Sequence, residues 1–388
     1  MAFTVGIPKE IKIGERRVSL TPKGVEVLVR NQVKVCVEKA AGLGCGFSDD
    51  DYQRAGAQLL KTNGEVWKQA TLIKKVKEPV SQEFEFFKSH HIIFTYLHLA
   101  APSERPLVET LKKAKATAIA YETIEKNGQT PLLKPMSEVA GILAAYFAGV
   151  FQNHIQVQGK KIFGLETAKP MMEKLAADYP LIPKNLRLGK VAILGGGYVG
   201  EQAAQMAASM GGSVSVSEIS EFRRKKLREE FSARGLTIQI LDPSETNLYE
   251  EVLDSCEVLI ACVHAPGKRA PLVVDRESLR KISAQKKKII LDVAIDQGGN
   301  VAESQPTDYE NPLYSDSFGN IRFSVTNMPS LSSRGASKAI EKVSLDYTLA
   351  LAQGLDSAIE RYPELRSGVN VRNGVLVHPE VCEAHKLN

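Results

Sequence analysis

The stretch from Val191 to Glu218, VAILGGGYVGEQAAQMAASMGGSVSVSE, constrains the fold of this chain more than any other. It joins a β-branched run, a glycine-rich turn, small apolar residues at helical spacing and a second β-branched run. Gly195, Gly197 and Gly200 form a GxGxxG pattern in the turn. Such glycines allow a tight turn, close approach of the backbone to a pyrophosphate and close helix packing, while the helix N-terminus supplies free amides. The stretch therefore predicts a dinucleotide-binding βαβ unit.

Glu218 follows the second β-branched run, at the distance expected for a carboxylate that accepts hydrogen bonds from the adenosine ribose hydroxyls. A carboxylate at this position repels a 2′-phosphate, so the sequence favours NAD over NADP. The basic run at 223–226 keeps NADP open, because basic side chains near that position can hold a phosphate. The same run is also typical of a solvated helix face.

Strand-like and helical segments alternate along the chain, which predicts parallel sheets with helices on both faces. One series begins at Phe3 and a second begins near Lys190, and 388 residues suffice for two domains. Long apolar helical patterns at 137–152 and 334–360 flank the second series, which indicates that the chain leaves the first domain and returns to it. We expect two Rossmann-like, doubly wound α/β domains with an active-site cleft between them. Residues 1–136 plus 308–388 would form a discontinuous substrate domain, and 137–307 an NAD-binding domain.

Composition and charge exclude several classes of function. The formal net charge of +5 is spread over the chain, without the basic stripe or module that nucleic-acid binding requires. No apolar run approaches the roughly 20 residues needed to span a membrane. The five cysteines lack CxxC spacing and the N-terminus does not look like a signal peptide, so we expect a cytoplasmic protein. Neither HExxH nor CxxC occurs, so no metal site is expected.

Three residues suit the chemistry of a nicotinamide enzyme. His98 stands near the end of the apolar run IIFTYLHLA, where it is either a core histidine or an acid/base at a strand end. Arg17 follows the first strand, and Lys77 follows an apolar strand just before a proline. An arginine fork and a lysine charge together suit an α-amino or α-keto acid, although each base alone is typical of a protein surface.

Thr21 before Pro22 predicts a helix start capped by the threonine hydroxyl.

Nearly the whole chain resembles the alanine dehydrogenase family, which shares its fold with the first domain of proton-translocating transhydrogenase. The matching stretches are VGIPKEIK, RVSLTP, KVKEP, FTYLHLAA, AYETI, PMSEVAG, GGGYVG, PGKRAP, DVAIDQGG and TNMPS. The resemblance implies reversible, NAD-dependent oxidative deamination of L-alanine to pyruvate and ammonium. It also implies a homo-oligomer, commonly a hexamer.

Carried onto matching positions, the resemblance implies a role for each candidate residue. Arg17 and Lys77 would hold the substrate carboxylate and keto oxygen, His98 would transfer protons, and Asp296 would be its acidic partner beside the nicotinamide. Further contacts with NAD are implied for Ser137, Glu218, Arg223, Ser244, Val263, His264, the strand Val293, Ala294, Ile295 and Asp296, and Val325, Thr326, Asn327 and Met328.

Some positions depart from the family pattern. The family commonly has Asp at the position of Glu218, Lys at that of Arg223 and an arginine at that of Gln305. A longer, helix-like segment at 159–190 also replaces a short glycine-rich loop. Other interpretations are a transhydrogenase-like NAD-binding subunit, the same chemistry on another small amino acid, and an NAD-responsive binding protein. KVKEP, LHLA and AIDQGG favour the dehydrogenase, because the transhydrogenase lacks the lysine and histidine and has AQNGG in place of AIDQGG.

Overall fold

The computed structural model describes residues 3–158, 186–264 and 269–385. The chain divides into two compact units, Met1–Met136 with Ser333–Asn388 and Ser137–Ser332. The sequence prediction placed the first boundary at the same position but put the return at residue 308. In the structure the return comes 25 residues later, because the strands formed by 313–315 and 321–323 pair within the sheet of the second unit. Most of the long segment at 159–190 lies outside the described residues.

Within the described residues, the first unit contains an eight-stranded sheet of order β15-β14-β6-β5-β4-β1-β2-β3. Its strands are β1 (Thr4–Ile7), β2 (Lys34–Glu38), β3 (Gln58–Leu60), β4 (Leu72–Lys74), β5 (Ile92–Thr95), β6 (Thr117–Ala120), β14 (Val369–Arg372) and β15 (Val375–Leu376). The strands from β1 to β6 pair in parallel, while β14 and β15 add an antiparallel edge. The order in which successive strands are added reverses between β1 and β4, and doubly wound sheets bind ligands at such a switch point.

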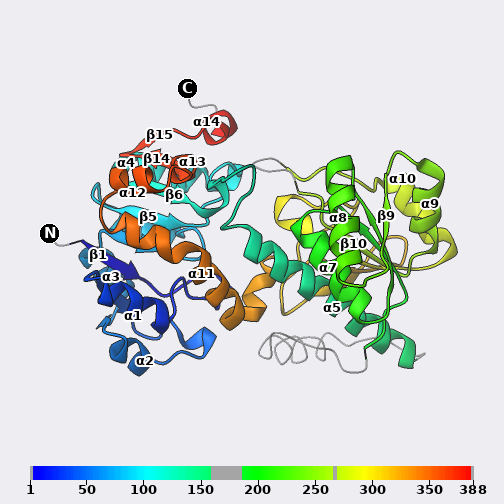
Figure 1. Cartoon of the computed structure of the whole chain (residues 1–388), viewed down its shortest axis with the longest axis horizontal. Helices are drawn as coiled ribbons and strands as arrows, with labels where there is room; N and C mark the ends of the chain where they lie inside the picture. The colour runs from blue at the N-terminus through cyan, green and yellow to red at the C-terminus, as the bar shows by residue number, and fades with distance from the viewer. Residues whose placement is uncertain (1–2, 159–185, 265–268, 386–388) are drawn as a thin grey trace. The chain divides into compact units, whose positions relative to one another are not determined.

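Helices cover both faces of this sheet, because successive strand residues point to opposite sides. One apolar cluster joins Val5, Ile7 and Val37 to α1, α2, α11 and α12, and a second joins Cys36 and Ile93 to α3 and α4. Figure 1 shows α11 along this sheet. The helices of this unit are α1 (Pro22–Arg30), α2 (Asp49–Arg54), α3 (Asn63–Gln69), α4 (Arg105–Ala114), α11 (Ser333–Leu351), α12 (Leu355–Arg361), α13 (Leu365–Gly368) and α14 (Pro379–His385), with 3-10 turns η1 (Leu43–Cys45), η2 (Ser81–Phe86), η3 (Pro102–Glu104) and η4 (Tyr121–Thr123).

Helix α1 begins at Pro22 as predicted, but the threonine hydroxyl does not cap it. Instead, the carboxylate of Glu341 on α11 accepts a hydrogen bond from the backbone N–H of Thr21 at 2.5 Å and one from that of Gly24. A Cβ on Gly24 would lie 2.4 Å from this carboxylate, so glycine lets Glu341 approach. The predicted cap was wrong because a distant residue supplies it.

The described part of the second unit contains a seven-stranded sheet of order β12-β13-β11-β10-β7-β8-β9. The strands are β7 (Lys190–Leu194), β8 (Ser213–Ser217), β9 (Gln239–Leu241), β10 (Val258–Ala261), β11 (Ile289–Asp292), β12 (Leu313–Ser315) and β13 (Ile321–Phe323). All neighbours are parallel except the edge pair of β12 and β13. The direction of winding reverses between β7 and β10, as in a Rossmann fold.

Helices cover both faces of this second sheet, because its strands are apolar on both sides. Helices α5, α7 and α8 share one apolar cluster with Val191 and Ile193, and α9 and α10 share the other with Ala192 and Leu194. These helices, labelled in Figure 1, are α5 (Lys134–Gln158), α7 (Tyr198–Ser209), α8 (Glu221–Ala233), α9 (Thr246–Ser255) and α10 (Arg276–Gln285), with 3-10 turns η5 (Val293–Gln297) and η6 (Met328–Ser332). The glycine turn after β7 and the segment after β10 therefore lie on either side of the switch point.

Candidate functional site

The candidate residues of the first unit follow neighbouring parallel strands. Arg17 belongs to the segment after β1, Lys77 follows β4, and His98 follows β5, and these strands are adjacent in the sheet. The next strand, β6, is followed by Glu122, to which the sequence reasoning gave no role. Because the carboxyl ends of parallel strands meet at one edge, residues separated by about a hundred positions in the sequence lie at one end of this sheet.

Arg17 is buried, with 3% of its side chain exposed, and is fixed by a carboxylate. Its Nε donates to Glu15 Oε1 at 2.8 Å and its Nη2 donates to Glu15 Oε2 at 2.6 Å, which is a bidentate pair. Its Nη1 lies 3.1 Å from Met136 Sδ. Two edges of the guanidinium are therefore held by Glu15 and Met136. Sequence reasoning missed the role of Glu15. Two arginines, Arg16 and Arg17, follow it directly, and the sequence does not show which of them it binds.

Lys77 and His98 are in contact, with 3.4 Å between Lys77 Nζ and His98 Nε2. Lys77 Nζ also lies 3.7 Å from Glu78 Oε2, and Glu78 bonds Lys12 as well. These cations lower the pKa of Glu78 against the effect of its burial. The contact brings together two of the three residues that the sequence assigned to the substrate, beside an ionised carboxylate.

His98 is exposed, although Leu97 and Leu99 on either side of it are buried. It lies beyond β5, with a left-handed backbone at φ 50°, and its ring stacks on that of Tyr96 with 6.3 Å between centroids. The apolar run was therefore a strand only as far as Thr95. This geometry argues against a core histidine, because a core histidine has its ring inside the protein.

His91 is the histidine of this segment that has a structural role. It is 1% exposed, its Nδ1 accepts from the backbone N–H of Lys88 at 3.0 Å, and its Nε2 lies 2.9 Å from Trp67 O. Burial lowers its pKa to about 4, with a further contribution from His90. A neutral imidazole satisfied at both nitrogens stabilises the packing of α3 on the sheet.

Glu122 fixes the backbone on which His98 stands. Its Oε1 accepts from the N–H of His98 at 2.6 Å and from that of Leu97 at 3.1 Å, and its Oε2 accepts from Leu97 at 3.2 Å. Burial raises the pKa of Glu122 to about 7, against the effect of these hydrogen bonds and of Lys77. The carboxyl group thus holds the left-handed turn and titrates near neutral pH. Its position in AYETI was visible in the sequence, but its contact with the preceding strand was not.

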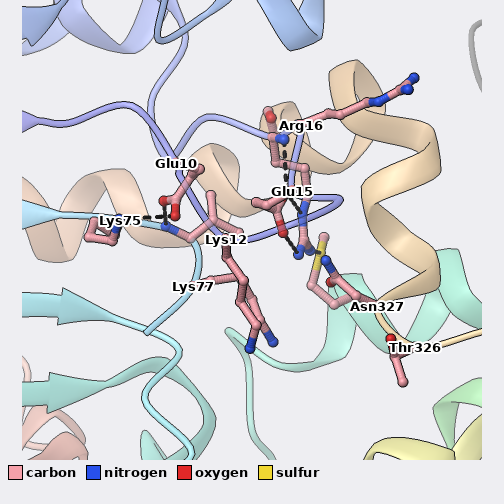
Figure 2. A network of polar contacts seen from close by, with 12 residues as sticks. Glu10, Lys12, Glu15, Arg16, Lys75, Lys77, Thr326 and Asn327 are labelled. Atoms are coloured by element: carbon pink, nitrogen blue, oxygen red, sulfur yellow. Dashed lines mark hydrogen bonds and ion pairs between the residues drawn. The ribbon is translucent and has the colours of Figure 1, made fainter. Parts of the chain in front are cut away.

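A buried ion cluster holds the segment between β4 and Lys77 (Figure 2). Lys75 Nζ lies 3.1 Å from Glu10 Oε2 and 2.9 Å from Glu83 Oε1, and each of these side chains is at most 4% exposed. Glu10 Oε1 accepts from the N–H of Val76 at 2.6 Å. Burial raises the pKa of Glu10 to about 7, against the attraction of Lys75. The cluster therefore fixes the backbone directly before Lys77.

The glycine turn of the second unit has the geometry that its sequence predicts. Gly195 has φ 98°, which favours glycine, and a Cβ on Gly200 would lie 1.9 Å from Gly195 O. A Cβ on Gly197 would meet nothing within 4 Å, so the turn is open on that side. Gly197 is also the N-cap of α7 and no side chain caps this helix. The open turn leaves the first amides of α7 available to a phosphate.

Glu218 and Arg223 both turn toward the glycine turn. Glu218 Oε2 accepts from the N–H of Gly196 at 2.9 Å, and Arg223 Nε donates to Gly196 O at 2.7 Å. Arg223 Nη2 also pairs with Glu201 at 2.7 Å, while Arg224 pairs with Asp242 at 2.6 Å. The first two bases of the run at 223–226 are therefore paired with carboxylates and are not simply a solvated face.

The two serines predicted to contact the cofactor lie elsewhere in the second unit. Ser137 is half-buried in the first part of α5. Ser244 is exposed in the turn after β9, where its hydroxyl donates to Asp242 Oδ1 at 2.7 Å. Asp242 is also the partner of Arg224, so Ser244 is linked to the basic run through one carboxylate.

The segments predicted to contact the nicotinamide follow β10, β11 and β13. Residues 293–296 were predicted as a strand, but they lie in the 3-10 turn η5, because β11 ends at Asp292 and Gly298 at φ 99° closes the turn. Asp296 is exposed at this turn and its Oδ2 lies 3.5 Å from the N–H of Asn327. His264 Nε2 lies 2.9 Å from Gln297 Nε2.

Not every residue of these segments is accessible. Val325, Met328 and Ile295 are buried, the first two in the core cluster, so any contribution of theirs to a site is through packing. Val263, Val293, Ala294, Thr326 and Asn327 are half-buried. The pairing of His98 with Asp296 joins residues of different units and stays a prediction.

Within the described residues, two other kinds of site are absent. No group of three or more His, Cys, Asp or Glu side chains in these ranges could hold a metal ion. Among the same residues, no helix is long and apolar enough to cross a membrane. All five cysteines are free thiols.

Comparisons with known proteins match the whole chain. The alanine dehydrogenase/PNT N-terminal domain matches residues 6–140 and the corresponding C-terminal domain matches residues 139–379. An alanine dehydrogenase from Bacillus subtilis is 38% identical over 380 residues, which cover 97% of this chain and 93% of that protein. One from Methanococcus maripaludis is 37% identical, with 99% and 96% covered.

Solved structures agree with these relatives. A structure of L-alanine dehydrogenase is 36% identical with a TM-score of 0.83, and 99% of each chain is covered. A transhydrogenase from Sinorhizobium meliloti, with a TM-score of 0.74 and 21% identity over 97% of this chain and 99% of that one, shows the same fold. By its sequence, its fold and the residues at its strand ends, the chain belongs to the alanine dehydrogenase/PNT family.

Proposed function

We propose that the protein oxidises L-alanine with NAD⁺ and water to pyruvate, ammonium, NADH and a proton, and that it also catalyses the reverse reaction. The contact between Lys77 and His98 at the carboxyl ends of β4 and β5 is the observation that carries this proposal. It places a lysine amino group 3.4 Å from an imidazole, the kind of side chain suited to a reaction that moves protons at a carbon next to a carboxylate.

The second unit fits NAD. The open side of the glycine turn and the uncapped start of α7 suit a pyrophosphate, and Glu218 suits the adenosine ribose. When bound, NAD⁺ would supply the acceptor for the hydride of the substrate Cα. We assign Ser137, Arg223 and Ser244 to the adenosine and phosphate half. Val263, His264, residues 293–296 and residues 325–328 would support the nicotinamide half.

The first unit would hold the substrate. Arg17 binds the substrate carboxylate, and its pairing with Glu15 and Met136 fixes the plane of the guanidinium in advance. Lys77 donates to the oxygen at C2, so that the positive charge stabilises the negative charge that develops there. Its Nζ lies 3.7 Å from Glu78 Oε2, which holds the lysine side chain at this edge of the sheet.

His98 would carry the protons of the reaction. Once the substrate amine has lost a proton to solvent and the hydride has left Cα, water attacks the iminium carbon and His98 accepts a proton from that water. His98 then returns this proton to the nitrogen of the carbinolamine, the C–N bond breaks, and the hydroxyl proton passes to the released ammonia, which gives pyruvate and ammonium. We propose that Asp296 favours the cationic amine and the imidazolium through its negative charge.

An absorbance assay at 340 nm tests the proposal. Pyruvate with ammonium is expected to oxidise NADH faster than other small keto acids do, and NADH is expected to be preferred over NADPH. Oxidation of NADPH alone would refute the role of Glu218. A purified, folded protein without turnover on any small keto acid would refute the reaction itself.

We also propose that the protein acts as a cytoplasmic homo-oligomer, a hexamer by family resemblance. Five free thiols support a reducing compartment. Light scattering of the purified protein measures the molar mass, and a monomer at working concentration would contradict the proposal.

A further inference from the structure

One buried side chain joins two segments that we propose to support the nicotinamide. Asn300 is fully buried, and its Oδ1 accepts from the N–H of Val263 at 2.8 Å. Its Nδ2 donates to Val263 O at 3.0 Å and to Pro271 O at 2.9 Å. The amide thus pairs with both backbone groups of Val263, as a neighbouring strand would.

The hydrogen bonds between Asn300 and Val263 lie just beyond the end of the pairing between β10 and β11. The register of β10 with β11 stops at Ala261 and Asp292, two residues before Val263 and one before η5. Asn300 continues the connection with a side chain and holds the segment after β10 against the one after β11. The amide therefore sets the relative position of Val263–His264 and Val293–Asp296.

The backbone of Asn300 is fixed as well. Its N–H donates to Asp292 Oδ2 at 2.8 Å, and the same oxygen accepts from the N–H of Val301 at 3.0 Å and from Ser304 Oγ at 2.6 Å. Asn300 O accepts from Val273 and Val274. Because Asp292 is the last residue of β11, the amide is tied to the end of the strand that leads into Asp296.

We propose that Asn300 is a positioning residue for hydride transfer, which places the nicotinamide ring by holding the segments after β10 and β11 at a fixed separation. The proposal rests on the proposed function. It concerns chiefly the nicotinamide half of the cofactor, because Glu218 follows β8, which is not a neighbour of β10 or β11, although Val263 also lies against Gly195 at the glycine turn. A displacement of about 1 Å in such a site can cost about 100-fold in rate.

The test compares Asn300→Ala and Asn300→Asp with Asn320→Ala. Asn300→Asp keeps the shape and the acceptor for the Val263 N–H, but it loses both donated hydrogen bonds. Asn320 is a matched control, because it is also fully buried and bonds Lys288 N–H, Ser283 Oγ and Asp316 through its side chain. It lies at the opposite end of β11, next to Lys288.

Three measurements separate positioning from stability. The Asn300 variants are expected to lower kcat by about 10- to 100-fold and to raise the kinetic isotope effect with 2-deuterated L-alanine, because hydride transfer becomes slower than the other steps. They are expected to bind NADH less tightly while binding ADP-ribose, which lacks the nicotinamide, as the parent does. Asn320→Ala is expected to lower Tm without changing the isotope effect or the ratio of the two affinities.

The outcomes decide the proposal in each case. An Asn300→Asp enzyme with the parent's kcat and isotope effect would overturn it, and so would an Asn320→Ala enzyme with the same kinetic changes. Where Asn300→Ala does not fold, Asn300→Asp alone decides. If the parent does not oxidise alanine, the proposed function fails, but the ratio of NADH to ADP-ribose affinity still tests the role of Asn300.

Discussion

Replacing Glu122 by Gln tests the coupling between a half-buried carboxyl group and the turn that carries His98. Burial raises the folded-state pKa of Glu122 from 4.5 to about 7. In the folded protein the carboxyl therefore keeps its proton to higher pH than in the unfolded chain. The stability that this protonated form contributes is fully present below pH 4.5 and is lost as the pH rises to about 7.

The size of the effect follows from the shift. Each pKa unit corresponds to about 1.4 kcal/mol, so the parent is expected to lose about 3 kcal/mol of unfolding free energy from this group between pH 4.5 and 7. Glutamine does not titrate and resembles the protonated form. Its carbonyl can replace Oε1, which accepts from the N–H groups of both Leu97 and His98.

Urea denaturation at pH 5 and pH 8 measures the difference. Glu122→Gln is expected to match the parent at pH 5 and to exceed it by up to about 3 kcal/mol at pH 8. Because Glu10 titrates in the same range, the variant keeps part of the pH dependence. If the unfolding free energies of the parent and of the variant change by the same amount between pH 5 and pH 8, Glu122 is not the titrating group.

Three further substitutions address other parts of the protein. His98→Ala is expected to lower kcat by about 10²- to 10⁴-fold while NADH binding and Tm stay the same, since the ring is exposed, and loss of folding would restore the core-histidine interpretation. Lys74→Met is expected to stabilise the protein by a few kcal/mol at pH 7 and progressively less toward pH 10.5, because burial lowers the pKa of this lysine to about 7. Thermal melts at several pH values measure the gain, and a gain that does not change with pH would contradict this. Gly200→Ala places a methyl group where a Cβ would lie 1.9 Å from Gly195 O, so NADH affinity measured by fluorescence is expected to fall at least tenfold, and unchanged affinity would refute the packing role.

Sequence periodicity predicted the fold because the residues that build both sheets carry their own signal. The β-branched runs, the glycine turn and Glu218 are local patterns, and the order of parallel strands places the segments that follow them at one edge. Periodicity did not locate the ends of strands. Tyr96, Leu97 and Leu99 are buried beyond β5, so their apolar character resembles a strand although the chain has already turned.

The residues that support the site were not predictable in the same way. Glu122, Glu10 and Asn300 act on backbone groups that are 24, 66 and 37 residues away in the sequence. No spacing rule connects such partners, and a buried carboxylate looks like a surface residue in the sequence. The 3-10 turn at 293–297 was also missed, because Val293, Ala294 and Ile295 are apolar like a strand and the end of the turn depends on Gly298.

The turn at His98 shows why supporting residues and functional residues have to be read together. A left-handed backbone at φ 50° costs a non-glycine residue about 1 kcal/mol or more, although histidine tolerates it better than most. A typical hydrogen bond contributes about 0.5–1.5 kcal/mol, so the two that Leu97 and His98 donate to Glu122 can offset that cost. Since Leu97 and Leu99 anchor both sides of the turn in the core, the left-handed residue is the one whose side chain leaves it. The exposed imidazole is therefore a consequence of a half-buried glutamate just after the next strand, which explains why the apolar run alone could not distinguish a catalytic from a structural histidine.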